Sequence, residues 1–235
     1  MNLRPARAKG VSGHAANPKS ALSPAEGSET CTEPGRSIRN SKLGSDRIAR
    51  WLSRIFHPFL IVIPTLFLAI YLDTGSLSAA VRWTAVSVAL VIAPVSIFIL
   101  VNLRTGRYSD AYVSIREHRH SLFLVGGACL LLLLTVLMLA AAPRIILACL
   151  YAAVIANAIG ALINRFTKVS VHAAAMAGCA TVLFSLSPPI GLALGTATLI
   201  VGWARVRARH HTLAQVITGW AIAIVCVTAV FALYL

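Results

Sequence analysis

Hydrophobic residues form long unbroken runs from about residue 58 to the last residue, and short polar segments separate the runs. A helix needs about 20 such residues to cross the hydrocarbon core of a bilayer. The runs do not alternate polar with apolar positions, which argues against a membrane β-barrel. The pattern therefore predicts an all-α fold, a polytopic transmembrane helical bundle of about six to seven spans.

Seven candidate spans follow from the ends of these runs. The first, fifth and sixth are short, so we expect them to tilt or to be only partly embedded. Pro64 and Pro94 lie inside the first two, where a kink is tolerated because neighbouring helices can satisfy the freed backbone groups. The predicted spans are 58–72, 79–103, 122–142, 145–164, 171–186, 189–203 and 213–235.

The residues before the first span divide into two parts. Residues 1–45 are rich in Ser, Pro, Gly and charge and have no apolar period, which predicts a disordered basic tail. Residues 46–57, DRIARWLSRIFH, place Ile48, Trp51, Leu52 and Ile55 at helical spacing with arginines between them. This predicts an amphipathic helix lying in the membrane interface, followed by one transmembrane domain over 58–235. The first apolar run begins too late for a cleavable signal peptide.

Composition and charge narrow the partners. Hydrophobic residues make up 58% of the 235 residues and charged residues 12%, whereas a soluble domain has about a quarter charged. The formal net charge is +14, and the basic residues gather in the tail and in short loops. That distribution favours membrane lipids with anionic headgroups, or a phosphorylated ligand, over nucleic acid. The five cysteines have no metal-ligand spacing, which predicts a packing role.

Three loops are rich in basic residues: 104–120, 165–170 and 205–212. Two predicted spans separate each of these loops from the next. All three should therefore emerge on the same side of the bundle, where residues far apart in the sequence can converge on one site.

The side chains of these loops suit phosphate chemistry. Arginine and lysine supply fixed charge and several donors to phosphate oxygens. Histidine can act as a nucleophile or as a general acid near neutral pH. The second loop leads into His172 and the third contains His211. Two simpler interpretations stay open at this point, namely that the arginines only set membrane orientation and that each histidine only caps a helix.

The spacing in the third loop points to a family. Arg205 is followed by five residues and His211, and Gln215 comes four positions later. Ser170 and His172 open the fifth span. This arrangement resembles the type 2 phosphatidic acid phosphatase superfamily of integral membrane lipid phosphatases. Its motifs are Lys, six residues, Arg-Pro; then Pro-Ser-Gly-His; then Ser-Arg, five residues, His, three residues, Asp.

The match to these motifs is partial and covers residues 104–235. Val169-Ser170-Val171-His172 keeps the serine and the histidine of the second motif. Ala204-Arg205 keeps the arginine of the third and loses its serine, and Gln215 replaces its aspartate. Arg119-His120 is the best candidate for the first motif, although Tyr112 stands where its lysine is expected. Lys168 or Arg116 could supply that charge.

The resemblance implies a mechanism and a set of roles. His211 would attack phosphorus and form a phosphohistidine, and His172 would protonate the leaving alcohol, with Gln215 orienting His211. The phosphate would be bound by Arg205, Lys168, Arg116, Arg119 and Ser170. It implies no metal and no other cofactor. The expected substrate is a lipid-phosphate or isoprenoid-phosphate, either a monoester or a pyrophosphate.

Gln215 leaves a non-enzymatic alternative open. An amide oxygen can still accept a hydrogen bond from His211, but it cannot stabilise the imidazolium as a carboxylate would. The chain could therefore bind a lipid phosphate without turning it over. A small-solute transporter is the other alternative, although no predicted span contains a carboxylate for ion coupling. An intramembrane prenyltransferase would need Asp-rich motifs for magnesium, which are missing here.

The distribution of basic residues also predicts orientation. The tail and all three basic loops fall on one side of a seven-span arrangement, and only Arg82 and Arg144 fall on the other. By the positive-inside rule we expect an integral protein of a bacterial plasma membrane with a cytoplasmic N-terminus.

Overall fold

The computed structural model describes residue 51, residues 57–108 and residues 118–235 of the chain. Within these residues all regular structure is helical. The predicted tail, most of the predicted interfacial helix and Arg116 lie outside the described residues. The helices are α2 (Pro58–Thr74), α3 (Leu77–Ser87), the π-helix η1 (Val88–Ile92), α4 (Ala93–Arg104), α5 (His118–Leu139), α6 (Arg144–Ile163), α7 (Val171–Leu186), α8 (Pro188–Arg207) and α9 (Leu213–Tyr234).

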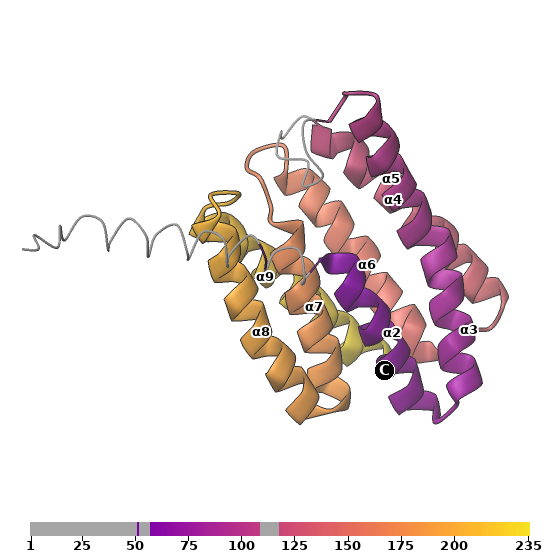
Figure 1. The fold of residues 1–235 in the computed structure, drawn as a ribbon. Helices are drawn as coiled ribbons and strands as arrows, with labels where there is room; N and C mark the ends of the chain where they lie inside the picture. Colours follow the sequence, from indigo (N-terminus) through magenta and orange to yellow (C-terminus); the bar gives the residue numbers. More distant parts are fainter. Residues whose placement is uncertain (1–50, 52–56, 109–117) are drawn as a thin grey trace, which may run out of the picture.

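The helices run up and down side by side in one bundle (Figure 1). Because α3, η1 and α4 follow one another without a break, they form one long rod, and the described chain reverses direction at the end of each rod. Short turns join α2 to α3, α5 to α6 and α7 to α8 at one end. The described residues of the three basic loops all lie at the other end, as the alternation of spans predicts.

Five of the described helices are long and apolar enough to cross a membrane. They are the rod Leu77–Arg104, the segment Arg119–Leu139 of α5, and α6, α8 and α9. Pro58–Thr74 and Val171–Leu186 are apolar but shorter. Large hydrophobic side chains such as Leu124, Leu192 and Val225 are exposed along the outside of the bundle. These features fit an integral membrane protein, because lipid accepts apolar surface that water would not.

A proline explains the π-helix in the long rod. Pro94 has no backbone N–H, and its ring would collide with the carbonyl one turn earlier. Just before it, the N–H of Ala93 bonds the carbonyl of Val88, five residues back, instead of the usual four. The wider turn takes up the disruption without breaking the rod, which is the usual use of a π-bulge.

Small residues let α9 approach its neighbours closely. A Cβ on Gly219 would lie 2.8 Å from the carbonyl oxygen of Ser170, so only glycine allows α9 to sit against the start of α7. A Cβ on Gly202 of α8 would lie 2.3 Å from the ring of Trp220. These contacts hold α7, α8 and α9 together, and α7 packs against both partners along its length.

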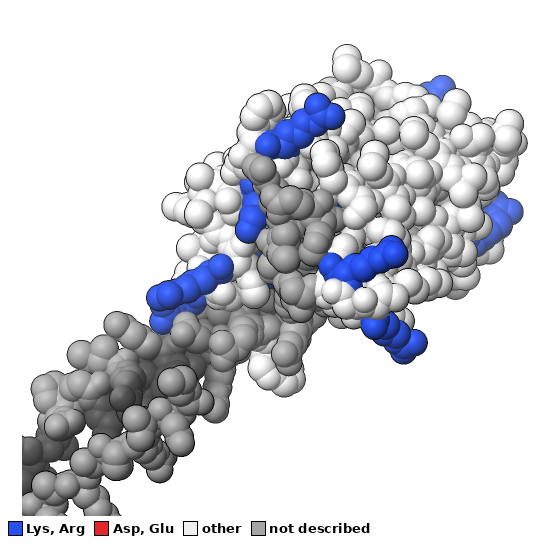
Figure 2. All heavy atoms as spheres, turned by 90° about the horizontal axis from the view of Figure 1, so that it is seen from above, with Lys and Arg blue, Asp and Glu red and all other residues white. Residues whose placement is uncertain are grey.

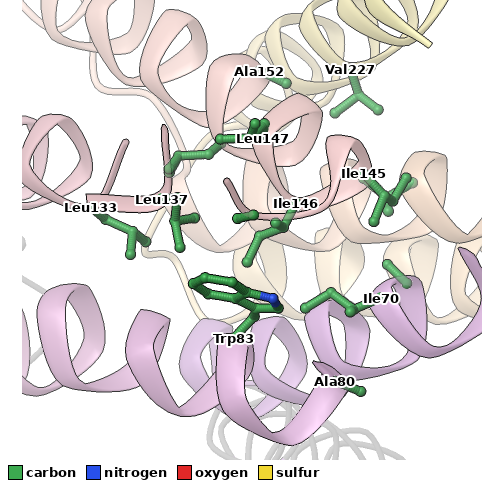
Figure 3. Close-up of a cluster of buried hydrophobic side chains, with 14 residues drawn as sticks. Ile70, Ala80, Trp83, Leu133, Leu137, Ile145, Ile146, Leu147, Ala152 and Val227 are labelled. Atoms are coloured by element: carbon green, nitrogen blue, oxygen red, sulfur yellow. The ribbon is translucent and has the colours of Figure 1, made fainter. Parts of the chain in front are cut away.

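The largest cluster of buried hydrophobic side chains lies toward the end of the bundle where short turns join α2 to α3 and α5 to α6. Figure 3 shows this cluster in close-up. Trp83 of α3 packs there among residues from the last turns of α2 and α5 and the first turns of α6. Ile70, Leu137 and Ile145 are fully buried in it. This end of the bundle is therefore closely packed by large side chains.

The helix ends correct two predicted loops. α8 continues four residues beyond the predicted end of its span at residue 203, so Arg205 and Arg207 are helical. α5 begins at His118, which makes Arg119 and His120 helical as well. The apolar runs end earlier than the helices because a helix can carry charged side chains on its last turn outside the hydrocarbon.

Candidate functional site

His211 is placed by the way α8 ends. The N–H of His210 bonds the carbonyl of Arg205, five residues back, and the N–H of Arg209 bonds the carbonyl of Val206. Arg209 adopts a left-handed conformation, with φ of 57°. This is a Schellman ending, which reverses the chain direction. The N–H of His211 also bonds the carbonyl of Arg205, at 3.3 Å, so the loop folds back and brings His211 beside the last turn of α8.

Gln215 fixes the orientation of the His211 ring. Thr212 and Gln215 form a capping box at the start of α9, in which the Thr212 N–H donates to Oε1 of Gln215. That bond identifies the atom facing His211 as the amide oxygen. Oε1 lies 3.0 Å from Nδ1 of His211, so Nδ1 carries the proton and donates. The hydrogen bond expected between these two residues is present.

A second contact agrees with this tautomer. Nη2 of Arg119 lies 3.5 Å from Nε2 of His211. A guanidinium can only donate, so Nε2 accepts and its lone pair faces the arginine. Burial, followed by the charges of Arg119 and Arg205, lowers the pKa of His211 to about 3, while the bond to Gln215 raises it. His211 is therefore neutral at physiological pH, with a free-base nitrogen on the arginine side.

Two arginines are buried in this region. The Arg119 side chain is 5% exposed, and its Nη1 donates to the carbonyl of Val169 at 2.7 Å. Arg205 is 1% exposed and is the largest fully buried side chain among the described residues. The one acidic side chain that the structure describes, Asp73, lies at the end of α2, near Arg144 at the far end of the bundle. Two cationic side chains thus converge where an anion would be stabilised.

His172 lies in the same cluster, near the start of α7. Arg205, His57, His211 and Arg119 are close enough to act on it electrostatically. Ser170, the preceding cap residue, is fully buried, and its hydroxyl accepts the N–H of Ala173. Its backbone N–H bonds the carbonyl of Gln215. The hydroxyl proton is still available as a donor.

A residue that the sequence reasoning missed completes the cluster. His57 precedes α2, and its ring meets that of His172 edge to face, with 5.4 Å between centroids. Its Nδ1 accepts the N–H of Phe59 and so caps α2, which places the proton of the neutral ring on Nε2. Burial, and then the charge of Arg205, lower the pKa of His57. His57 before Pro58 is a sequence signal for a helix start, but nothing in it indicates a neighbour 115 positions later.

Of the predicted phosphate ligands, Lys168 stands apart from the buried cluster. It lines an open pocket of about 570 Å³ together with His211 and Gln215. The pocket opens on the end of the bundle where several other Lys and Arg side chains gather (Figure 2). No described Asp or Glu is visible on that face. An anion approaching from outside would therefore meet positive charge before it reaches His211.

The structure thus brings together His211, His172, Gln215, Arg205 and Arg119, with Ser170 beneath them and Lys168 at the rim. All of these residues belong to the second half of the chain. They are far apart within it, since Arg119 opens α5 and His211 precedes α9. Among the described residues no group of three or more His, Cys, Asp or Glu is arranged to hold a metal ion.

Comparison with protein-family models, with curated proteins and with solved structures finds no match for this chain.

Proposed function

We propose that this chain is a divergent member of the type 2 phosphatidic acid phosphatase superfamily. In this proposal it hydrolyses a lipid-linked phosphate monoester or pyrophosphate through a phosphohistidine. The observation that carries the proposal is the arrangement of His211. Its Nδ1 is held by Gln215, its Nε2 lone pair faces Arg119, and Arg205 and His172 lie close by. An oriented neutral imidazole beside two buried arginines suits nucleophilic attack on a phosphate.

Hydrolysis takes place in two chemical steps. Nε2 of His211 attacks phosphorus, and the bond from phosphorus to the lipid oxygen breaks, leaving its electron pair on that oxygen. His172 gives a proton to the lipid oxygen, and the negative charge of the bound phosphate favours the protonated form of His172 from which that proton comes. Water then attacks the phosphohistidine while neutral His172 takes a proton from it, the P–N bond breaks, and inorganic phosphate is released. Arg119 and Arg205 stabilise the negative charge of the transferring group throughout.

A second candidate function is binding of a lipid phosphate without turnover. It is favoured by one specific observation: the partner of His211 is an amide, Gln215, and not a carboxylate. The amide orients the ring but gives no charge to stabilise the imidazolium. Every described neighbour of His172 is neutral or positive as well. In this alternative the arginines retain the phosphate and the reaction does not follow.

We further propose that all seven rods cross the membrane, in a bacterial plasma membrane with the N-terminus in the cytoplasm. The short helices α2 and α7 are as apolar as the five long ones, and each connects loops at opposite ends of the bundle. Of the described Lys and Arg, only Arg82 and Arg144 fall toward the end opposite the site. The positive-inside rule then places the site on the cytoplasmic face.

Phosphate release by the purified chain, measured on a panel of lipid phosphates, tests the hydrolysis proposal. His211→Ala should abolish both turnover and trapping of labelled phosphate on the protein. His172→Ala should slow turnover by roughly a hundredfold to ten-thousandfold, most for poor leaving groups. His210→Ala is the matched control, since this adjacent histidine has no assigned step, and it should leave turnover near the wild-type rate.

The outcomes separate the two functions. Lipid phosphate that binds but is never hydrolysed by the wild-type chain would support the binding alternative. Activity that is lost with a chelator and restored by magnesium would contradict the proposed mechanism.

A further inference from the structure

The bundle contains a partly open apolar cavity of about 370 Å³ between the site and the packed core. Residues of α2, the long rod, α5, α6, α7 and α9 line it, and hydrophobic or small side chains form nearly all of its wall. Protein interiors are otherwise close-packed. A void of this size is costly if left empty, and its apolar wall excludes the polar partners that ordered water needs.

One end of the cavity is lined by immediate sequence neighbours of the site residues. Val169, whose carbonyl accepts the hydrogen bond from Arg119, lines it, as does Val171, the neighbour of His172. Pro58 and Phe59, which follow His57, line the same end. Residues of the candidate site are therefore adjacent in sequence to residues of the apolar wall.

From that end the cavity runs into the bundle. Its wall on α7 extends from Val171 to Val182, and the eleven steps between these two residues cover about 16 Å of helix. The space is kept open by small side chains, including Gly160 on α6 and Ala174 and Gly178 on α7. The π-helix η1 contributes Val88 and Val91 to the opposite wall. The result is a long, narrow apolar space with a cationic group of residues at one end.

We infer that this cavity holds one hydrocarbon chain of the substrate, and that the chain's phosphate end lies between Arg119, Arg205 and His211. This inference rests on the proposed function and sets its substrate class. A volume of 370 Å³ has room for about a dozen groups the size of a water molecule, since water occupies about 30 Å³ in the liquid. Methylene groups are of similar size. One chain fits and two do not, so single-chain lipid phosphates are preferred over diacyl ones.

Binding tests the inference independently of turnover. The full chain carrying His211→Ala, reconstituted in lipid nanodiscs, is titrated with dodecyl phosphate, butyl phosphate and dioleoyl phosphatidic acid. Dodecyl phosphate should bind at least tenfold tighter than butyl phosphate, because its longer chain buries more apolar surface. It should also bind tighter than the diacyl lipid.

A pair of variants tests whether the hydrocarbon chain of the ligand lies in the cavity. Ala153→Leu fills the cavity from α6 and should remove the preference for dodecyl phosphate, with butyl phosphate binding unchanged. Ala158→Leu adds the same side chain to an exposed position of α6 outside the cavity and should keep the preference. Unchanged butyl phosphate binding shows that the variant is folded, and Ala156→Leu repeats the test if Ala153→Leu does not fold.

The results distinguish this inference from the proposed function. A chain-length preference that survives both cavity-filling variants would overturn the inference, whatever the activity. If the wild-type protein binds dodecyl phosphate through the cavity but releases no phosphate, the hydrolysis proposal is overturned and the inferred binding site for the hydrocarbon chain is supported. If the protein hydrolyses lipid phosphates at rates that do not depend on the length of the hydrocarbon chain, the inferred chain-binding site is overturned and the hydrolysis proposal is supported.

Discussion

At the scale of single residues, the candidate site depends on which proton each imidazole carries. His211 donates through Nδ1 to Gln215, and His57 accepts at Nδ1 from a backbone N–H, so the two rings adopt opposite tautomers. In both cases a hydrogen bond at the start of a helix sets the tautomer. For His211 it is part of the capping box of α9, and for His57 it is the cap of α2. The helix ends therefore supply the hydrogen bonds that a carboxylate supplies in other sites.

Gln215→Glu should make the site more active. The carboxylate keeps the capping box and is favourable in the first turn of a helix. It also raises the pKa of His211 from about 3, because a nearby negative charge favours the imidazolium. The neutral ring is the nucleophile, so the acid limb of the pH–rate profile should move to higher pH. Turnover at pH 8 should rise by at least about tenfold.

Gln215→Leu is the control for this change, since it removes the acceptor and should lower turnover. An acid limb that stays in place in Gln215→Glu would show that His211 is not the titrating nucleophile.

His57→Asn should reduce turnover without loss of stability. Asparagine keeps the cap on α2, so the free energy of unfolding should change by only a few tenths of a kcal/mol. It removes the ring that contacts His172. If His57 acts by positioning His172, the kinetic effect should disappear in a His172→Ala background, with a coupling energy of about 0.5–3 kcal/mol. Effects that simply add would show that His57 does not act through His172.

At the scale of elements, the site is positioned by close contact between helices. The start of α7 lies against α9 at Gly219, and the Schellman ending of α8 returns the chain to Thr212. α9 thus begins where its Gln215 can reach both His211 and the backbone of Ser170.

Gly219→Ala should destabilise the bundle and disturb the site. The added methyl would meet the Ser170 carbonyl at 2.8 Å, a backbone atom that cannot move aside. We expect a loss of about 1–3 kcal/mol in the free energy of unfolding. Gly195→Ala on α8 is the matched control, because its Cβ would meet nothing within 4 Å. Thermal unfolding in detergent measures both, and equal melting temperatures would contradict the close contact.

Ala141→Gly should stabilise the protein. The turn after α5 is a second Schellman ending, with Ala141 in the left-handed region at φ of 49°. A side chain there costs about 1–2 kcal/mol that glycine avoids, partly offset by the greater freedom of glycine in the unfolded chain. We expect a gain of about 1 kcal/mol. Ala140→Gly, one residue earlier and without positive φ, should lower stability, and the comparison of the two melting temperatures is the test.

At the scale of the whole molecule, the distribution of charge along the bundle sets two ends apart. The loops with most of the described basic residues share one end of the bundle (Figure 1), and the closely packed core lies toward the other. The apolar cavity lies between them.

The proposed orientation predicts where the C-terminus lies. With seven spans and a cytoplasmic N-terminus, Leu235 is external. Alkaline phosphatase fused after it should be active, and a green fluorescent protein fusion there should not fluoresce. Fluorescence from that fusion would contradict either the orientation or the count of seven spans. A matched fusion after Gly106, in the first basic loop, should give the opposite pair of results.

The sequence by itself determined most of the helices. Run length and hydrophobicity locate each rod to within a few residues. This works because a helix makes its backbone hydrogen bonds within its own segment, so its position depends on the local sequence. Alternation of spans places the three basic loops at one end. The spacing from Arg205 to His211 and Gln215 identifies the cluster, and the capping box from Thr212 to Gln215 is also a local pattern that the sequence displays.

Only the tertiary structure decided what those residues can do. The presence of His57 beside His172, the burial of Arg119 and Arg205, and the low pKa of His211 all depend on contacts between helices far apart in the chain. The apolar cavity is likewise formed by several rods and has no signature in any one of them. Local spacing sets the dihedral angles and the faces of a helix, whereas desolvation and charge proximity arise only when those faces are packed together.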